Sequence, residues 1–277
     1  MKLFVTGGTG FIGSHFLNAA HHAGHEIIAL KRAGSEPPIE LNRQPIWVEG
    51  DLSTDCSEHL EKCDALIYIA AFGVSPQPAN WKDCFYWNVF QSIRLFHRAA
   101  EAGIDKMLAV GSYAEYGESG PAYSFIPPDA PLMPIGPYPS SKAAFSIAAQ
   151  GLCREKHLRF SYIRLFSAYG EGQYEASLWP SLKKAAFEGR DFPMTPGEQV
   201  RDFIPVEEVA QKLVEELEFK NVEKGKPRVV NLGSGKPLSV LEFSRYFWEK
   251  WNARGKLQIG RLPYRNNEVM RCVPELE

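Results

Sequence analysis

A glycine-rich turn near the start of the chain constrains the fold more than any other feature. The apolar residues 2–5 predict a strand, and a helical pattern begins at Ile12 and stops at Gly24. Glycines between them permit a tight turn and a close approach of the backbone to a pyrophosphate, while the helix N-terminus offers free N–H groups to an anion. The turn therefore predicts a dinucleotide site built from Gly7, Thr9, Gly10, Phe11, Ile12 and Gly13. The alternative is a glycine-rich loop without a ligand.

Short apolar runs recur along the chain, with helical patterns between most of them. They cover residues 26–30, 45–49, 65–70, 106–111, 159–165 and 228–232. This alternation predicts an α/β fold, a Rossmann-type doubly wound parallel sheet with a small interleaved C-terminal substrate lobe. We assign residues 1–167 plus about 201–233 to the dinucleotide-binding domain, and about 168–200 plus 234–277 to the lobe.

Ligands of such sheets bind beyond the carboxyl ends of the strands. Gly7, Asp51, Ala70, Ala71 and Ser112 all follow or end predicted strands. We therefore expect them to meet at one cleft.

Tyr138 and Lys142 carry the chemistry that this cleft suggests. Their spacing of four puts a phenol and an ammonium on one face if the segment is helical, where the positive charge is expected to lower the pKa of the tyrosine. Such a tyrosine exchanges protons near neutral pH. Tyr246 and Lys250 have the same spacing, but no serine-ended strand precedes them, and we interpret that segment as an ordinary helix.

The second predicted strand ends in Lys31 and Arg32, where a fold that prefers NAD places an acid for the ribose hydroxyls. A guanidinium there suits a 2′-phosphate, so we predict NADP(H) as the preferred cofactor, with NAD(H) as the alternative. The pair is otherwise a solvated basic strand end.

Charge and composition exclude several classes of function. A net charge of −2 gives no general attraction to nucleic acid or to an acidic membrane, and no apolar run approaches the ~20 residues of a membrane span. The first residues predict a strand and no secretory signal, so we expect a cytoplasmic enzyme without nucleic-acid or membrane partners.

No metal site is predicted. The five cysteines are odd in number and contain no C-x-x-C pair, which argues against disulfides and zinc. His21 and His25 have the spacing of a metal pair, but Gly24 is expected to end the helix between them.

An ordered set of motifs extends over nearly the whole chain. It comprises residues 6–13, 50–52, 69–71, 88–89, 111–117, 138–142, 164–170 and 200–206. Together they resemble the extended short-chain dehydrogenase/reductase family, in the nucleotide-sugar branch of its NAD-dependent epimerases, dehydratases and 4-ketoreductases.

The resemblance implies a role for several residues. Ser112 would hydrogen-bond the reacting oxygen, Tyr138 would exchange the proton, and Lys142 would hold the nicotinamide ribose. For Ser112 the alternative is a capping or loop hydroxyl. The resemblance further implies that Asp51 and Leu52 border the adenine, that Ala70 and Ala71 line the cofactor, that Asn88 marks the helix beneath the site, and that helices about 88–102 and 140–155 pair into a homodimer.

Arg201 resembles the arginine that clamps a nucleotide-sugar diphosphate, although a salt bridge to Asp202 or Glu198 is the alternative. Arg265 and Arg271 are both candidates for a second phosphate contact. Ser167 and the Ser177–Leu178 pair stand where the family usually has substrate-contacting asparagines. The predicted substrate contacts are Ser112, Glu115, Ser167, Ser177, Leu178, Arg201 and Arg265.

Three reactions share this scaffold. In the dehydratases an Asp-Glu pair follows the serine, but here Tyr113 and Ala114 follow it and Glu115 comes one residue too late. We therefore predict an NADPH-dependent 4-ketoreductase acting on a nucleotide-linked 4-keto-6-deoxyhexose, resembling the CDP-abequose synthase type of O-antigen pathways. An NAD-dependent nucleotide-sugar 4-epimerase is the alternative. A catalytically silent dinucleotide-binding relative, serving as a redox sensor or assembly subunit, is a third possibility.

Overall fold

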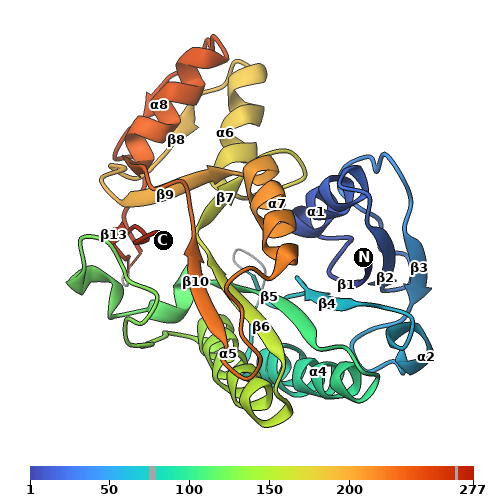
Figure 1. The fold of residues 1–277 in the computed structure, drawn as a ribbon. Coiled ribbons are helices and arrows are strands. Elements are labelled where there is room, and N and C mark those ends of the chain that lie inside the picture. The colour runs from blue at the N-terminus through green and yellow to red at the C-terminus, as the bar shows by residue number, and fades with distance from the viewer. Residues whose placement is uncertain (75–78, 266–267) are drawn as a thin grey trace.

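The computed structural model describes residues 1–74, 79–265 and 268–277 and is built around a seven-stranded parallel sheet (Figure 1). Its spatial order is β10-β6-β5-β4-β1-β2-β3, and every neighbouring pair is parallel. The strands are β1 Lys2–Thr6, β2 Glu26–Lys31, β3 Ile46–Glu49, β4 Ala65–Tyr68, β5 Lys106–Ser112, β6 Arg159–Leu165 and β10 Arg228–Leu232. The predicted doubly wound fold is confirmed, and each strand lies at or within a few residues of its predicted position.

The strand order changes direction beside β1. The chain runs outward through β2 and β3, then returns so that β4 pairs with the other edge of β1. At such a switch point the loops after the two central strands separate to opposite faces of the sheet, and a crevice forms at their carboxyl ends.

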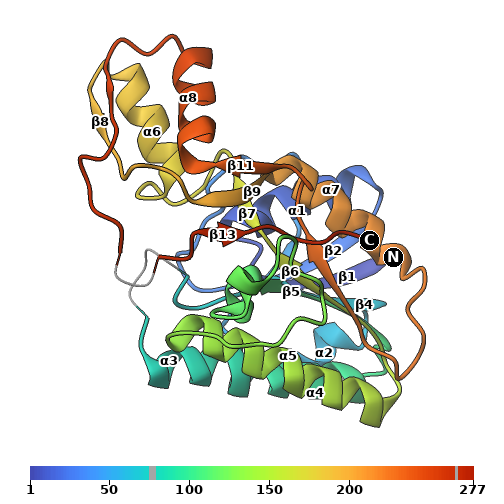
Figure 2. The same ribbon diagram turned by 90° about the vertical axis from the view of Figure 1, so that its left-hand side faces the viewer.

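Helices cover both faces of the sheet, as Figure 2 shows. On one face lie α1 Phe11–His22 and α7 Val206–Glu215, and on the other lie α2 Ser57–Leu60, α4 Ser92–Glu101 and α5 Pro137–Lys156. Because successive strand residues point to opposite faces, Val5 packs under α1 while its neighbour Phe4 packs in the α4–α5 layer. Both side chains are fully buried, and apolar burial of this kind is the main stabilising contribution to the layers.

A smaller sheet joins the main sheet to the lobe. β9 Val200–Pro205 pairs with β7 Ser167–Tyr169, β11 Pro237–Ser239 and β13 Arg271–Cys272. From the sequence pattern we assigned residues about 201–233 to the dinucleotide-binding domain. β9, the first part of that range, lies in this smaller sheet, where strands before and after it in the chain are hydrogen-bonded to its edges.

The lobe, which lies at the top of Figure 1, has a hydrophobic core of its own. It consists of α6 Leu178–Phe187, α8 Val240–Lys250 and the short pair β8 Phe192–Pro193 and β12 Leu257–Gln258. Aromatic rings fill it, among them Trp179, Phe247 and Phe243, the last stacked on Phe203 at a centroid distance of 3.9 Å. Tyr246 is 57% exposed on α8, with Lys250 Nζ 5.6 Å from its ring centre.

Short helical segments complete the chain. They are α3 Trp81–Phe85, the π-helical η1 Tyr86–Gln91, and the 3-10 turns η2 Tyr113–Tyr116, η3 Gly120–Ala122 and η4 Glu216–Glu218. None of the helices in the described ranges has the length and apolar character needed to cross a membrane.

Candidate active site

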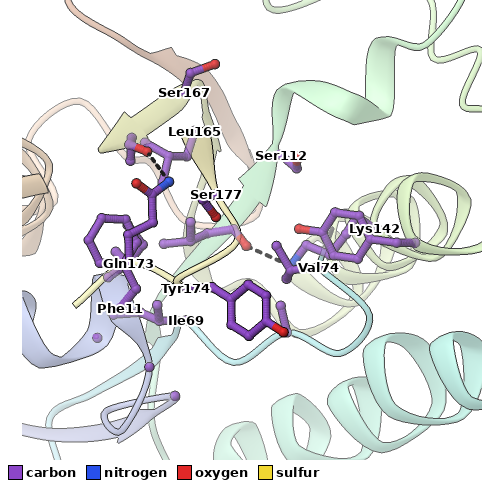
Figure 3. A pocket seen from close by; sticks show the side chains of 18 of the residues that line it. Phe11, Ile69, Val74, Ser112, Lys142, Leu165, Ser167, Gln173, Tyr174 and Ser177 are labelled. Carbon is purple, nitrogen blue, oxygen red and sulfur yellow. Dashed lines mark hydrogen bonds between the residues drawn. The ribbon is translucent and has the colours of Figure 1, made fainter. Parts of the chain in front are cut away.

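A cavity of about 1220 Å³ lies between the carboxyl edge of the main sheet and the lobe. Figure 3 shows Ser112 and Lys142 entering it from β5 and α5, and Gln173 and Tyr174 from the segment after β7. The structure brings together around it Gly7, Thr9, Gly10, Phe11, Ile12, Gly13, Lys31, Arg32, Asp51, Leu52, Ala70, Ala71, Ser112, Tyr138, Lys142, Ser167, Ser177, Leu178, Arg201 and Arg265. Of the predicted site residues, Glu115 is absent from this lining.

The glycine turn at one end of the cavity has no room for side chains at two positions. Gly7 has φ +79°, and a Cβ there would lie 2.6 Å from the backbone nitrogen of Ala70. A Cβ at Gly13 would lie 2.0 Å from the carbonyl oxygen of Gly7. The N-cap of α1 is Gly10, so no side chain caps the helix, and its first turn contains no acidic residue. This backbone cradle fits a dinucleotide pyrophosphate.

The two basic residues after β2 differ in their surroundings. Lys31 Nζ lies 2.8 Å from Glu36 Oε1 and 5.3 Å from the ring centre of Trp47. Arg32 is exposed and lines the cavity, and within the described ranges no carboxylate lies within ion-pair distance of it. Arg32 is therefore the better candidate for an anionic ligand group.

Ser112, Tyr138 and Lys142 meet at the opposite side of the same cavity. Ser112 ends β5, and its hydroxyl accepts a hydrogen bond from the Ala114 N–H at 3.2 Å. It is thus an N-cap of η2 and a cavity-lining hydroxyl at once. Tyr138 and Lys142 lie in the first turns of α5, which starts with Pro137 after Gly136 at φ +89°. The predicted helix therefore carries both side chains.

The predicted effect of Lys142 on Tyr138 is wrong in this structure. Lys142 Nζ donates to the carbonyl oxygen of Val110 at 2.7 Å and lies 5.5 Å from the ring centre of Tyr68. Burial lowers the pKa of Lys142 to about 8, against the opposing charge of Glu115. Burial and then the Glu115 charge raise the pKa of Tyr138, and a hydrogen bond to Ser112 opposes them. The phenol is thereby kept protonated.

Glu115 was predicted to contact the substrate, and this prediction is wrong. Its side chain is fully buried beneath the cavity. The carboxylate accepts from the Ser112 N–H at 2.8 Å and from Arg164 Nε at 2.9 Å. It is therefore held by protein groups and does not reach the cavity.

Arg201 lines the cavity, but it also forms an ion pair that the sequence did not reveal. Its Nη2 lies 3.1 Å from Glu268 Oε1 and donates to the carbonyl oxygen of Val269. The predicted alternative, a salt bridge to Asp202 or Glu198, is wrong, because Asp202 accepts two backbone N–H groups and Glu198 accepts a tyrosine hydroxyl.

The two other candidate phosphate contacts are separated by the structure. Arg265 lines the cavity. Arg271 donates instead to the Ser124 carbonyl oxygen at 3.0 Å, and its guanidinium lies 5.8 Å from the ring centre of Phe125.

Sequence reasoning missed several polar side chains in the cavity. Tyr113 follows Ser112 directly and stacks on Phe166 at 5.4 Å. Gln173 and Gln199 each have a buried side-chain oxygen without a hydrogen-bond partner among the described residues. The adjacency of Tyr113 to Ser112 was a usable signal. The glutamines lie in irregular segments where periodicity gives no orientation.

A family model described as the NAD dependent epimerase/dehydratase family matches residues 3–233. A UDP-glucose 4-epimerase of Corynebacterium glutamicum is 27% identical over 259 residues, covering 87% of this chain and 77% of that protein. A CDP-abequose synthase of Salmonella muenchen is 25% identical over 273 residues, covering 97% and 87%.

Among solved structures, MoeE5 in complex with UDP-glucuronic acid and NAD is similar to this chain. Its TM-score is 0.83 at 25% identity, and the match covers 100% of this chain and 90% of that one. The likeness thus includes both the main sheet and the lobe.

We predict that Gly13→Ala abolishes dinucleotide binding and destabilises the protein by at least about 1–3 kcal/mol, because the new Cβ overlaps the Gly7 carbonyl. Thermal unfolding and cofactor fluorescence measure the two effects. Gly151→Ala is the matched control: it lies in α5, where an added Cβ would have no neighbour within 4 Å, and it is expected to be neutral or to stabilise by up to about 1 kcal/mol. Unchanged dinucleotide binding in Gly13→Ala would refute the cradle.

Proposed function

The chain belongs to the NAD dependent epimerase/dehydratase family, and from this we propose that it is an oxidoreductase acting on a nucleotide-linked sugar. One observation carries the proposal: Ser112, Tyr138 and Lys142 line the same cavity as the glycine turn, and the lobe closes its other side. These three side chains supply an oxyanion contact, a proton donor and a cation in one place. The similar UDP-glucose 4-epimerase, CDP-abequose synthase and MoeE5 support the substrate class.

The specific reaction that we propose is the reduction of a nucleotide-linked 4-keto-6-deoxyhexose. When bound along the glycine turn, a nicotinamide dinucleotide would supply the hydride for C4 of the sugar. Tyr138 donates a proton to the carbonyl oxygen as it becomes a hydroxyl, and Ser112 donates a hydrogen bond that stabilises the developing negative charge. The raised pKa of Tyr138 keeps its proton available over a wide range of pH.

NADP(H) is the proposed cofactor, and Arg32 supports it. Its guanidinium is exposed at the cavity wall, whereas the charge of Lys31 is balanced by Glu36 at 2.8 Å. Recognition of a 2′-phosphate would thus depend mainly on Arg32.

The surroundings of Ser112 argue against dehydration. Tyr113 and Ala114 occupy the positions after the serine where an acid pair would be required. Glu115 has its carboxylate engaged by Arg164 and the Ser112 N–H. It is therefore unsuited to remove or donate a proton in the cavity.

An NAD-dependent nucleotide-sugar 4-epimerase is the second candidate. The similar Corynebacterium glutamicum protein and the NAD complex of MoeE5 favour it. A catalytically silent dinucleotide-binding relative has less support, because a protein that only binds the dinucleotide has no need for the Ser112–Tyr138–Lys142 arrangement.

We also propose a homodimer through the helices near 88–102 and 140–155. α4 and α5 pack side by side, and large apolar side chains are exposed on or next to this layer. They are Trp81, Phe85, Tyr86, Phe90 and Ile147, with exposures between 37% and 63%. A second copy of the layer would cover them.

For the reaction, we expect NADPH oxidation with 4-keto-6-deoxy nucleotide sugars, measured at the nicotinamide absorbance. Tyr138→Phe should reduce the rate by at least about 100-fold, because the proton donor is lost. Tyr246→Phe, in the other tyrosine–lysine pair, should retain the parent rate because Tyr246 lies on the exposed face of α8. Purified protein that retains NAD tightly and epimerises a UDP-sugar would replace the reductase with the epimerase.

For the cofactor, we expect Arg32→Ala to weaken NADPH binding about 10- to 100-fold while NADH binding changes little, since one charge-assisted contact to the 2′-phosphate is removed. Fluorescence titrations of both cofactors test this. Lys31→Ala serves as the control and should have a smaller effect, because Glu36 already balances that charge. Equal affinities of the parent protein for both cofactors would argue against the NADP(H) preference.

For the assembly, we expect Ile147→Glu to convert a dimer into a monomer, because it places a charge on an apolar contact surface. Light scattering after size-exclusion chromatography measures the mass. Tyr246→Glu, similarly exposed on α8, should leave the mass unchanged. A parent protein that is monomeric at micromolar concentration would refute the dimer.

A further inference from the structure

Glu115 forms a buried centre of interactions directly beneath the candidate catalytic residues. Its Oε1 accepts from the Ser112 N–H at 2.8 Å and from the Tyr162 hydroxyl at 2.7 Å, and its Oε2 accepts from Arg164 Nε at 2.9 Å. Both side chains of the Glu115–Arg164 ion pair are at most 4% exposed. The same carboxylate thus binds Ser112 and an arginine on the neighbouring strand β6.

Arg164 is in turn fixed by groups from other segments. Its Nη1 donates to the Pro128 carbonyl oxygen at 2.7 Å and to the Tyr116 hydroxyl at 3.2 Å. The Tyr116 hydroxyl donates to Asn231 Oδ1 on β10 at 2.6 Å. With its partners held in this way, Glu115 has little freedom to move, and Ser112 is held with it.

A second capping box in the same chain shows what this arrangement adds. On α8, Ser239 and Glu242 make the same reciprocal bonds, with the Ser239 N–H 2.8 Å from Glu242 Oε2, at an exposed site. That box works without a buried arginine. Capping alone therefore does not require the burial of an ion pair beside Ser112, which has a desolvation cost.

The charge of Glu115 acts on both titratable residues of the site. It raises the pKa of Tyr138 in addition to the effect of burial, and it opposes the lowering of the Lys142 pKa by burial. Both effects favour the protonated forms. The other titratable groups that interact with Tyr138 are Tyr113 on η2, Tyr68 on β4 and Tyr162 on β6, and Lys142 follows it on its own helix; Arg164 interacts with Tyr162 and Glu115.

We propose that Glu115 is a positioning residue of this active site: it fixes the backbone of Ser112 and holds a buried negative charge close to Tyr138 and Lys142. The claim that Glu115 serves catalysis rests on the proposed function. The effect of Glu115 on Tyr138 and Lys142 does not rest on it, because that effect exists in the protein without a substrate. Glu115 acts through Ser112, Tyr138 and Lys142 and does not touch the sugar.

The test is a pH titration, monitored by NMR, of the parent protein and of Glu115→Gln. Both proteins carry ¹³C at the tyrosine ζ and lysine ε positions. Glutamine retains an oxygen that can accept from the Ser112 N–H but removes the charge. We expect the pKa of Lys142 to fall from about 8 by about one unit, and the pKa of Tyr138 to become lower than in the parent protein. Spectra of Tyr138→Phe and Lys142→Met assign the signals.

Tyr162→Phe is the matched control. It removes one hydrogen bond to the same carboxylate oxygen and leaves the charge in place. It should not lower the pKa of Lys142, whereas a general loosening of the site would change that pKa in both variants. Unchanged titration of Tyr138 and Lys142 in Glu115→Gln would overturn the proposal.

The kinetic measurement applies once a substrate is reduced. In Glu115→Gln the alkaline limb of the kcat profile that comes from Lys142, whose pKa is about 8, should move down by about one pH unit, because the charge that favours its ammonium form is lost. KM should change little, because Glu115 does not line the cavity. A rise in KM with an unchanged pH profile would contradict a positioning role. Failure to find a substrate would refute the proposed function and leave the NMR result standing.

If Glu115→Gln yields too little folded protein, the ion pair is removed as a unit in Glu115→Leu/Arg164→Met. Replacing both charges by apolar side chains avoids an unpaired buried arginine. The pKa of Lys142 should again be lower than in the parent protein. A value as high as in the parent would overturn the proposal in this variant as well.

Discussion

The close approach of two backbone segments at the glycine turn is the constraint that shapes the whole site. The turn between β1 and α1 lies against the chain that leaves β4, and side-chain atoms at Gly7 or Gly13 would overlap backbone atoms. Because β1 and β4 are neighbours in the parallel sheet, this contact fixes the edge at which their loops diverge. The cavity opens at that edge, and Ser112 reaches it from the end of β5.

The lobe completes the cavity because the chain crosses between the two sheets more than once. β7 and β9 leave the main sheet, α7 and β10 return to it, and β11 and β13 come back to β9. Residues from segments distant in sequence, such as Ser167 and Arg265, therefore line one space. Rigid aromatic packing between α6 and α8 supports this wall.

Electrostatics within the site are set mainly by burial and by ion pairs that the sequence does not show. Lys142 donates to a backbone carbonyl, and the pKa of Tyr138 is raised by burial and by the charge of Glu115 where a lower value was expected. Glu115 is held by Arg164, and Arg201 by Glu268. In each case an ionisable side chain has a partner from another element, and this partner decides whether the side chain can face a ligand.

Local sequence patterns were enough to predict the parallel sheet, the glycine turn, the helix that carries Tyr138 and Lys142, and the meeting of these motifs at one edge. Those features follow from periodicity, from the steric freedom of glycine and from the geometry of parallel strands. The burial of Glu115, the place of β9 in the smaller sheet and the pairing of Arg201 with Glu268 became evident only in three dimensions. The partners Glu115–Arg164 and Arg201–Glu268 are 49 and 67 residues apart. Contacts over such separations depend on how the elements pack, and the pattern of any one segment does not contain that information.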